Sequence, residues 1–125
     1  MRAYDRNFDP PAPIAEVVLG HPISSANSGV LQGKLDSGAD LTVIPLDVVS
    51  QLSLRQRSAI WTRGYEGSFS QRHVSYVNLT IEGYHLSLVR CVATERTTVL
   101  VGRNVLNRFV VTLDGKKLAF QMKPI

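Results

Sequence analysis

The chain has 125 residues, of which 44% are hydrophobic and 19% charged, and its formal net charge is +4. This length and composition indicate one globular domain with its own core. The basic residues are scattered and do not alternate with aromatic residues, which argues against a nucleic-acid partner. The single cysteine, Cys91, excludes an internal disulfide and a multi-cysteine metal site. The lack of a long apolar run or a signal-peptide pattern argues against a membrane partner and predicts a cytoplasmic protein.

The first half of the chain predicts an extended arm, then short strands and one helix. Three prolines fix the backbone and remove amide donors in residues 1–13, which we expect to form an extended N-terminal arm before a single domain at residues 14–125. A loop is expected at residues 24–29. Apolar runs predict strands at residues 14–19, 30–35 and 41–44. One or two helical turns are expected at residues 46–52, with a shared apolar face of Leu46, Val49 and Leu52.

The second half of the chain predicts further strands and a second short helix. A helix is expected at residues 104–108, with Asn104 as a possible N-cap. Trp61 is expected to pack on the core as a strand anchor. The predicted strands are residues 58–61, 69–76, 77–82, 86–93, 99–102, 109–113 and 118–122, with Leu86, Leu88 and Val92 on one face of the fourth. The fold class is therefore all-β, a closed or nearly closed barrel with one or two short helices.

The segment Asp36-Ser37-Gly38-Ala39 occurs once and lies in a tight turn between two apolar runs. Two such loops at a symmetry axis would bring two Asp36 carboxylates together, and like charges that close must share one proton. The ionised carboxylate can then take a proton from water, while the protonated one donates to a substrate carbonyl. Gly38 would let the loops approach, and Ser37 could hydrogen-bond the opposing loop. Asp-Ser-Gly is also ordinary turn chemistry, which is the competing interpretation.

Two segments together resemble a known family. Residues 35–40 with the Thr-Val-Ile-Pro run that follows at 42–45 resemble the active-site motif of retroviral-type (retropepsin-like) aspartic proteases. Residues 99–109 resemble the apolar-apolar-Gly-Arg-Asn segment that precedes the C-terminal helix of that family, and the resemblance covers about residues 14–122. It implies a homodimeric aspartic endopeptidase without metal or cofactor that hydrolyses peptide or protein substrates. The catalytic residues would be Asp36, Ser37 and Gly38.

The same resemblance implies a flap over residues 61–76 that closes on the substrate. Gly64 and Gly67 would be its hinges, and Tyr65 would lie at its tip. The residues expected to bind substrate are Ala39, Asp40, Gly64, Tyr65, Glu66 and Gly67. Two glycines can equally mark an inert surface loop, which is the alternative for this segment.

The second motif implies three residues that support the site, namely Gly102, Arg103 and Asn104. Arg103 is expected to pair with Asp40 and to hold the helix against the active-site loop, although a plain surface arginine is the alternative. The N-terminal arm and residues 118–125 would interleave with those of the partner.

Two other functions stay open from the sequence. The first is a non-catalytic dimeric peptide-binding module on the same fold. The second, a basic nucleic-acid-binding barrel, depends on the net charge alone. The three histidines, His21, His73 and His85, lack metal-ligand spacing, so no metal site is expected. Asp114 is expected to be a turn residue.

Overall fold

The computed structural model describes residues 1–63, 67 and 69–125. These residues form two short helices and ten strands: α1 is Leu46–Gln51 and α2 is Arg103–Leu106. The strands are β1 Arg2–Ala3, β2 Ile14–Gly20, β3 Asn27–Leu35, β4 Thr42–Pro45, β5 Ser58–Arg63, β6 Phe69–Ile81, β7 Tyr84–Thr94, β8 Val99–Val101, β9 Phe109–Asp114 and β10 Ala119–Pro124.

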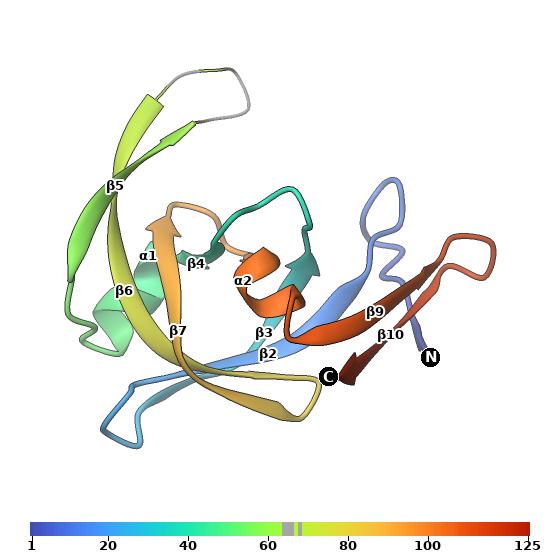
Figure 1. The fold of residues 1–125 in the computed structure, drawn as a ribbon, viewed down its shortest axis with the longest axis horizontal. Helices are drawn as coiled ribbons and strands as arrows, with labels where there is room; N and C mark the ends of the chain where they lie inside the picture. The colour runs from blue at the N-terminus through green and yellow to red at the C-terminus, as the bar shows by residue number, and fades with distance from the viewer. Residues whose placement is uncertain (64–66, 68) are drawn as a thin grey trace.

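Six strands close a barrel, shown in Figure 1. β2 pairs antiparallel with β3, β3 parallel with β8, β8 antiparallel with β4, and β4 parallel with β7. β7 pairs antiparallel with β6, which returns to β2 and completes the ring. Closure leaves no unpaired edge within the ring, and it confirms the barrel expected from the sequence.

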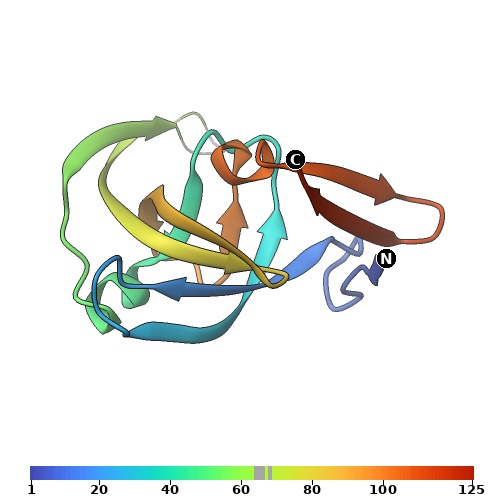
Figure 2. The same cartoon turned by 60° about the horizontal axis from the view of Figure 1, so that its bottom comes forward.

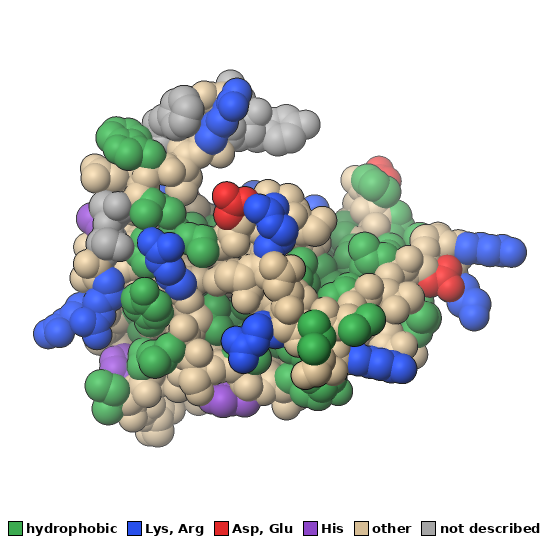
Figure 3. Space-filling model, in the orientation of Figure 1, with side chains coloured by type: hydrophobic (Ala, Val, Ile, Leu, Met, Phe, Trp, Pro, Cys, Tyr) green, Lys and Arg blue, Asp and Glu red, His purple; other side chains and the backbone are tan. Residues whose placement is uncertain are grey.

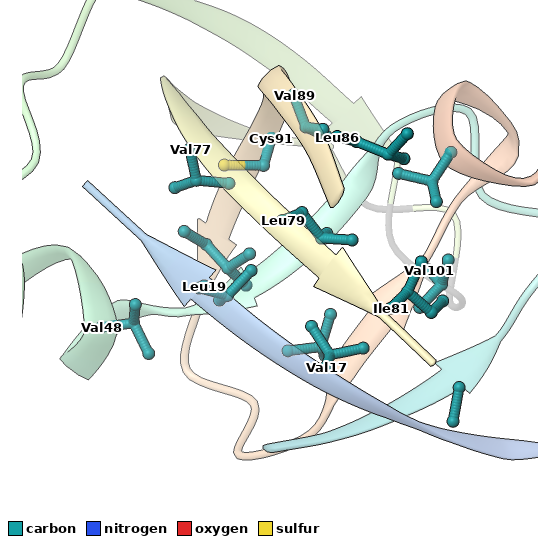
Figure 4. Packing of buried hydrophobic residues seen from close by; sticks show 14 of the residues in the cluster. Val17, Leu19, Val48, Val77, Leu79, Ile81, Leu86, Val89, Cys91 and Val101 are labelled. Carbon is teal, nitrogen blue, oxygen red and sulfur yellow. The ribbon is translucent and has the colours of Figure 1, made fainter. Parts of the chain in front are cut away.

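The core of the barrel is built largely from β-branched and aliphatic side chains, which fit the pleated surface of strands. Figure 4 shows Val17 and Leu19 of β2 facing Leu79 and Ile81 of β6, and all four are fully buried. Cys91 of β7 lies in the same core as a buried thiol. In the part of the chain whose burial is described, the buried polar residues are Thr42 and Ser75.

A bulge between β6 and β7 overturns the expected face of Leu88. Val77 lies opposite Val89 and Leu79 opposite Leu86, so two residues of β7 face the single residue Asn78. The extra residue shifts the alternation of β7 by one. Leu88, which simple alternation placed on one face with Leu86 and Val92, is therefore 61% exposed and has a φ of 53°, whereas the other two are buried.

The β5–β6 hairpin overturns the expected packing of Trp61. β5 pairs with β6 alone and lies outside the ring of six strands. Trp61, expected as a core anchor, is 69% exposed on this outer strand.

Three boundaries also differ from the sequence-based expectation. In α1 the buried residues are Val48 and, just after the helix, Leu52, whereas Leu46 is exposed because it begins the helix. The loop expected at 24–29 is shorter, since β3 begins at Asn27 and pairs with β2 there. Gly102, not Asn104, occupies the N-cap of α2, and Asn104 lies inside the helix.

The two chain ends form a second, three-stranded sheet in the order β1-β10-β9. Figure 2 shows this sheet projecting from one side of the barrel, with both termini on it. Phe120 is buried beneath it, and the Tyr4 ring lies 6.3 Å from the Phe120 ring. Lys117 donates its backbone N–H to Asp114 Oδ1 at 2.9 Å in the turn between β9 and β10, so Asp114 has the expected turn contact. Within the described residues, no helix is long and apolar enough to cross a membrane.

Candidate active site

Asp36 follows directly after β3, at the point where the strand leaves the barrel. Its backbone N–H donates to the Val101 carbonyl of β8 at 3.0 Å, which fixes the start of the loop. The loop then turns tightly, because Ala39 N–H donates to the Asp36 carbonyl at 3.2 Å. Gly38 N–H donates to Asp36 Oδ1 at 2.9 Å, so the turn itself orients the carboxylate. The residue is half-buried, and Oδ2 accepts no hydrogen bond from any described residue.

Ser37 and Gly38 form the exposed tip of this loop. The Ser37 carbonyl accepts a hydrogen bond from Arg103, but the Ser37 hydroxyl has no partner within the part of the chain that the structure describes. A Cβ at Gly38 would lie 3.2 Å from Asp36 Oδ1, closer than most real contacts. A side chain at position 38 would therefore press on the carboxylate that the turn orients.

Arg103, the first residue of α2, ties the loop at three points. Its backbone N–H donates to the Ala39 carbonyl at 2.8 Å, and Nη1 donates to the Ser37 carbonyl at 2.9 Å. Nη2 forms the expected ion pair with Asp40. The two side chains are 47% and 83% exposed, so water screens the charge attraction, and the backbone contacts do more to fix the geometry.

A buried network joins β4 to α2 behind the loop. The fully buried Thr42 donates its backbone N–H and its hydroxyl to Asn104 Oδ1, at 3.0 and 2.9 Å. The Thr42 oxygen in turn accepts the Gly102 N–H at 3.1 Å, while Asn104 Nδ2 donates to the Arg90 carbonyl of β7 at 2.7 Å. Sequence reasoning did not single out Thr42, although one polar residue in the apolar run 41–44 was the available signal.

Gly102 is required by space. A Cβ at this position would lie 2.6 Å from the carbonyl carbon and oxygen of Leu41 and 2.9 Å from Thr42 N. These are backbone atoms, which cannot move aside without breaking the β4–α2 network. Of the three expected support residues, Arg103 contacts the Asp36 loop directly, whereas Gly102 and Asn104 contact Thr42 behind it.

The expected flap residues Gly64, Tyr65 and Glu66 lie outside the described residues. Gly67 is described and has a φ of 84°, a conformation that favours glycine. Figures 1 and 2 both show β5 and the first half of β6 rising on the side of the barrel where the β3–β4 loop lies. In Figure 3 an acidic and a basic side chain lie next to each other on the surface below this hairpin.

The described part of the chain offers no other reactive centre of the kinds considered from the sequence. Its residues contain no group of three His, Cys, Asp or Glu side chains that could hold a metal ion. Burial raises the pKa of the Cys91 thiol to about 12, and its Sγ lies 3.4 Å from the Ser75 carbonyl. A thiol with this pKa is protonated at neutral pH and is inert as a nucleophile.

Comparison with known proteins identifies the family. Residues 25–105 match the family model described as aspartyl protease, and the chain belongs to this family. A search of curated proteins gives no match.

Solved structures give the fold. The chain is similar to the simian foamy virus (mac) protease, with 17% identity and a TM-score of 0.57 over 76% of this chain and 92% of that one. It is similar to the EIAV protease in complex with the inhibitor HBY-793, with 21% identity and a TM-score of 0.57 over 77% and 86%. A retropepsin-like aspartic protease from Rickettsia conorii matches with 16% identity and a TM-score of 0.55 over 87% and 91%. The retropepsin-like fold is thereby confirmed.

Proposed function

We propose that the chain is an aspartic endopeptidase that acts as a homodimer, with one Asp36 from each subunit. The observation that carries this proposal is the Asp36 loop itself. Its carboxylate is oriented through Oδ1 by the Gly38 N–H, and its backbone is tied to β8 and α2. Electrostatic catalysis requires groups held in place before the reaction, and this loop meets that requirement.

The chemistry needs two carboxylates and one shared proton. The ionised Asp36 accepts a proton from a bound water while the water oxygen attacks the peptide carbonyl carbon. The protonated Asp36 of the second subunit donates a hydrogen bond to the carbonyl oxygen and stabilises the negative charge that develops there. Collapse of the tetrahedral species transfers a proton to the leaving amine and breaks the C–N bond. Because the dyad must hold one proton, activity should favour mildly acidic pH.

The Asp36 loop and the exposed edges of the projecting sheet support dimerisation. The Asp36 loop occurs once per chain, and the exposed Ser37 hydroxyl has no partner among the described residues, so both suit an opposing loop. The projecting sheet has β1 and β9 as its edges, and edge strands readily pair with another chain. Val110 and Leu113 of β9 are both 58% exposed, which provides apolar surface for such an interface.

The substrate is proposed to bind as an extended strand, by backbone pairing of the β-augmentation kind. Ala39 and Asp40 would contact it from the active-site loop. Gly64, Tyr65, Glu66 and Gly67 would contact it from the flap. Apolar side chains on both sides of the cut are expected.

The test is the cleavage of a mixed peptide library, read by mass spectrometry as new peptide termini. The native chain should cut, and a statine-type transition-state mimic should block it. Asp36→Asn should abolish cleavage, whereas Asp47→Asn, which removes an exposed carboxylate from the first turn of α1, should keep it. Intact activity in Asp36→Asn would sink the proposal. Enrichment of peptides without new termini would favour the peptide-binding module instead.

A further inference from the structure

A concave site lies far from Asp36. It is a cavity of about 630 Å³ between the loop joining β2 to β3, the segment after α1, and the faces of β6 and β7. The cavity adjoins the beginning of β3, whereas Asp36 follows its end. β3 has nine residues. At about 3.3 Å per residue the two ends of this strand are roughly 25 Å apart. The volume is within the ordinary range for ligand sites.

Large apolar side chains are exposed around this cavity. Ile23 from the β2–β3 loop is 92% exposed, Leu88 from the β7 bulge 61%, and Tyr76 from β6 37%. Single exposed apolar residues are common, but three that line one cavity form a patch of the kind that marks an interaction site. Figure 3 shows hydrophobic side chains beside basic and histidine side chains in the area of the β2–β3 loop.

Hydrogen bonds hold the walls of the cavity in place. His21 Nδ1 accepts the N–H groups of Ile23 and Ser24, both at 3.0 Å, which fixes the β2–β3 loop. Asn78 Oδ1 accepts the Leu88 N–H at 3.1 Å and so anchors the bulge. On the other side, Arg57 N–H donates to the Val74 carbonyl at 2.8 Å. The site is therefore formed before any ligand binds, which lowers the entropic cost of binding.

Backbone strain gathers at the same place. Four non-glycine residues of the described chain have positive φ, and two of them, Ser53 and Leu88, line this cavity with φ of 53° each. Of the others, Glu82 precedes Gly83 in a tight turn and Leu118 precedes β10. Leu88 combines an unfavourable backbone with an exposed apolar side chain, neither of which serves the core. Strain of this kind is typical of functional sites.

The charges of the cavity indicate what it binds. Arg55 and Arg57 line it, no Asp or Glu does, and neither guanidinium has an ion-pair partner among the described residues. Because Ile23 and Leu88 are mostly exposed, an occupant that covers them must extend beyond the cavity, as a peptide segment does. We propose that this cavity docks a peptide segment of a partner protein in which large apolar side chains are flanked by Asp or Glu.

Binding tests this inference apart from catalysis. The full chain carrying Asp36→Asn, which cannot cut in the proposed mechanism, is titrated into a fluorescein-labelled peptide, Glu-Glu-Leu-Phe-Glu-Glu, and anisotropy is followed. We expect saturable binding, with no comparable binding of Lys-Lys-Leu-Phe-Lys-Lys or Glu-Glu-Ser-Ser-Glu-Glu. Amide chemical shifts should change at Ile23, Tyr76 and Leu88 and stay fixed at residues 36–40. Equal binding of the lysine peptide, no binding at all, or shifts centred on 36–40 would overturn the proposal.

Two variants make the test specific. Arg55→Glu with Arg57→Glu should weaken binding about tenfold or more, as loss of interfacial charge complementarity does. Arg6→Glu with Arg96→Glu changes the net charge equally at exposed residues elsewhere and should leave binding unchanged. Leu88→Asn should also weaken binding about tenfold, because it removes an apolar anchor, while asparagine tolerates the positive φ. If the two arginine pairs behave alike, general charge attraction explains the binding and the site is wrong.

Discussion

The loop that carries Asp36 and the hairpin formed by β5 and β6 lie on the same side of the barrel, but they are held in different ways. The loop is tied to β8 by Val101 and to α2 by Arg103, and the buried Thr42 network lies behind it. β5 lies outside the ring of six strands and pairs with β6. In the half of β6 that pairs with β5, Arg72 forms an ion pair with Glu95 at 3.0 Å, and its hydrogen bond lowers the pKa of that carboxyl.

This difference suits an enzyme that must keep its reacting groups fixed and still admit a chain-like substrate. Elements that move on binding are drawn from the less stable parts of a fold, whereas groups that stabilise a transition state are most effective when already in place. Substitutions behind the loop should therefore destabilise the fold strongly, and substitutions on the outer hairpin should not.

Among substitutions behind the Asp36 loop, the largest effect is expected at Gly102. Gly102→Ala forces a Cβ against backbone atoms of Leu41 at 2.6 Å, and overpacking of this kind should cost about 3 kcal/mol of unfolding free energy. Gly115→Ala is the control, because open space surrounds that position and its stability should stay within about 0.5 kcal/mol. Urea denaturation measures both. Equal midpoints for the two variants would show that the β4–α2 contact is loose.

Thr42→Val should have the next largest effect. It keeps the shape of the side chain but leaves the Gly102 N–H without its buried acceptor, which should cost about 2 kcal/mol. Thr112→Val, at an exposed position of β9, should change stability by less than about 0.5 kcal/mol. A small loss of unfolding free energy in Thr42→Val would mean that the network behind the loop contributes little to stability.

The thiol beside this network gives a pH test. Cys91 lies opposite Thr42 in the β4–β7 pairing, and burial raises its pKa from 9.0 to about 12. Below pH 9 both the folded and the unfolded chain keep the proton on the Cys91 thiol. Above it the unfolded chain loses the proton first, so stability should fall by about 1 kcal/mol over the first pH unit above 9. Cys91→Ala should lack this part of the slope in urea melts repeated across that range, and identical slopes would contradict the burial.

The exposed ion pair should matter less for stability. Arg103→Gln removes the pair with Asp40 and the bond to the Ser37 carbonyl, and because both side chains are largely exposed the cost should be about 0.5 kcal/mol. Expressed as a free energy, its loss of peptide cleavage should exceed its loss of stability, since the loop geometry depends on these contacts. Arg72→Gln, on the outer hairpin, likewise removes an arginine ion pair, the one with Glu95, and should affect cleavage less. Equal losses of cleavage would count against a positioning role for Arg103.

The smallest effect is expected at Trp61. Because the ring is 69% exposed on an outer strand, Trp61→Ala should change stability by less than about 0.5 kcal/mol. Phe120→Ala is the contrasting aromatic, 1% exposed, and should cost about 3–5 kcal/mol. Thermal unfolding compares the two. A Trp61 variant as unstable as the Phe120 one would show that the hairpin packs on the core after all.

The residues that could be predicted from sequence are those whose role depends on neighbours in the chain. The turn at Asp36 follows from a carboxylate and a glycine between two apolar runs. The Arg103–Asp40 pair joins residues distant in sequence, and it is expected only from the resemblance of the two motifs to a known family. Leu88, Trp61 and Asn104 could not be placed, because each depends on contacts distant in sequence. The bulge opposite Asn78 exposes Leu88, the outer position of β5 exposes Trp61, and Thr42 draws Asn104 away from a cap.

The central claim is that each active site needs an Asp36 from two chains, and subunit mixing tests it most directly. Native chain at fixed concentration is mixed with increasing Asp36→Asn chain, the dimeric state of both is checked by size-exclusion chromatography, and peptide cleavage is followed. We expect cleavage to fall as mixed dimers form, because a native chain in a mixed dimer has no second Asp36 to complete its dyad. Cleavage that stays constant while mixed dimers are present would mean that one chain holds a complete site, and the account would be wrong.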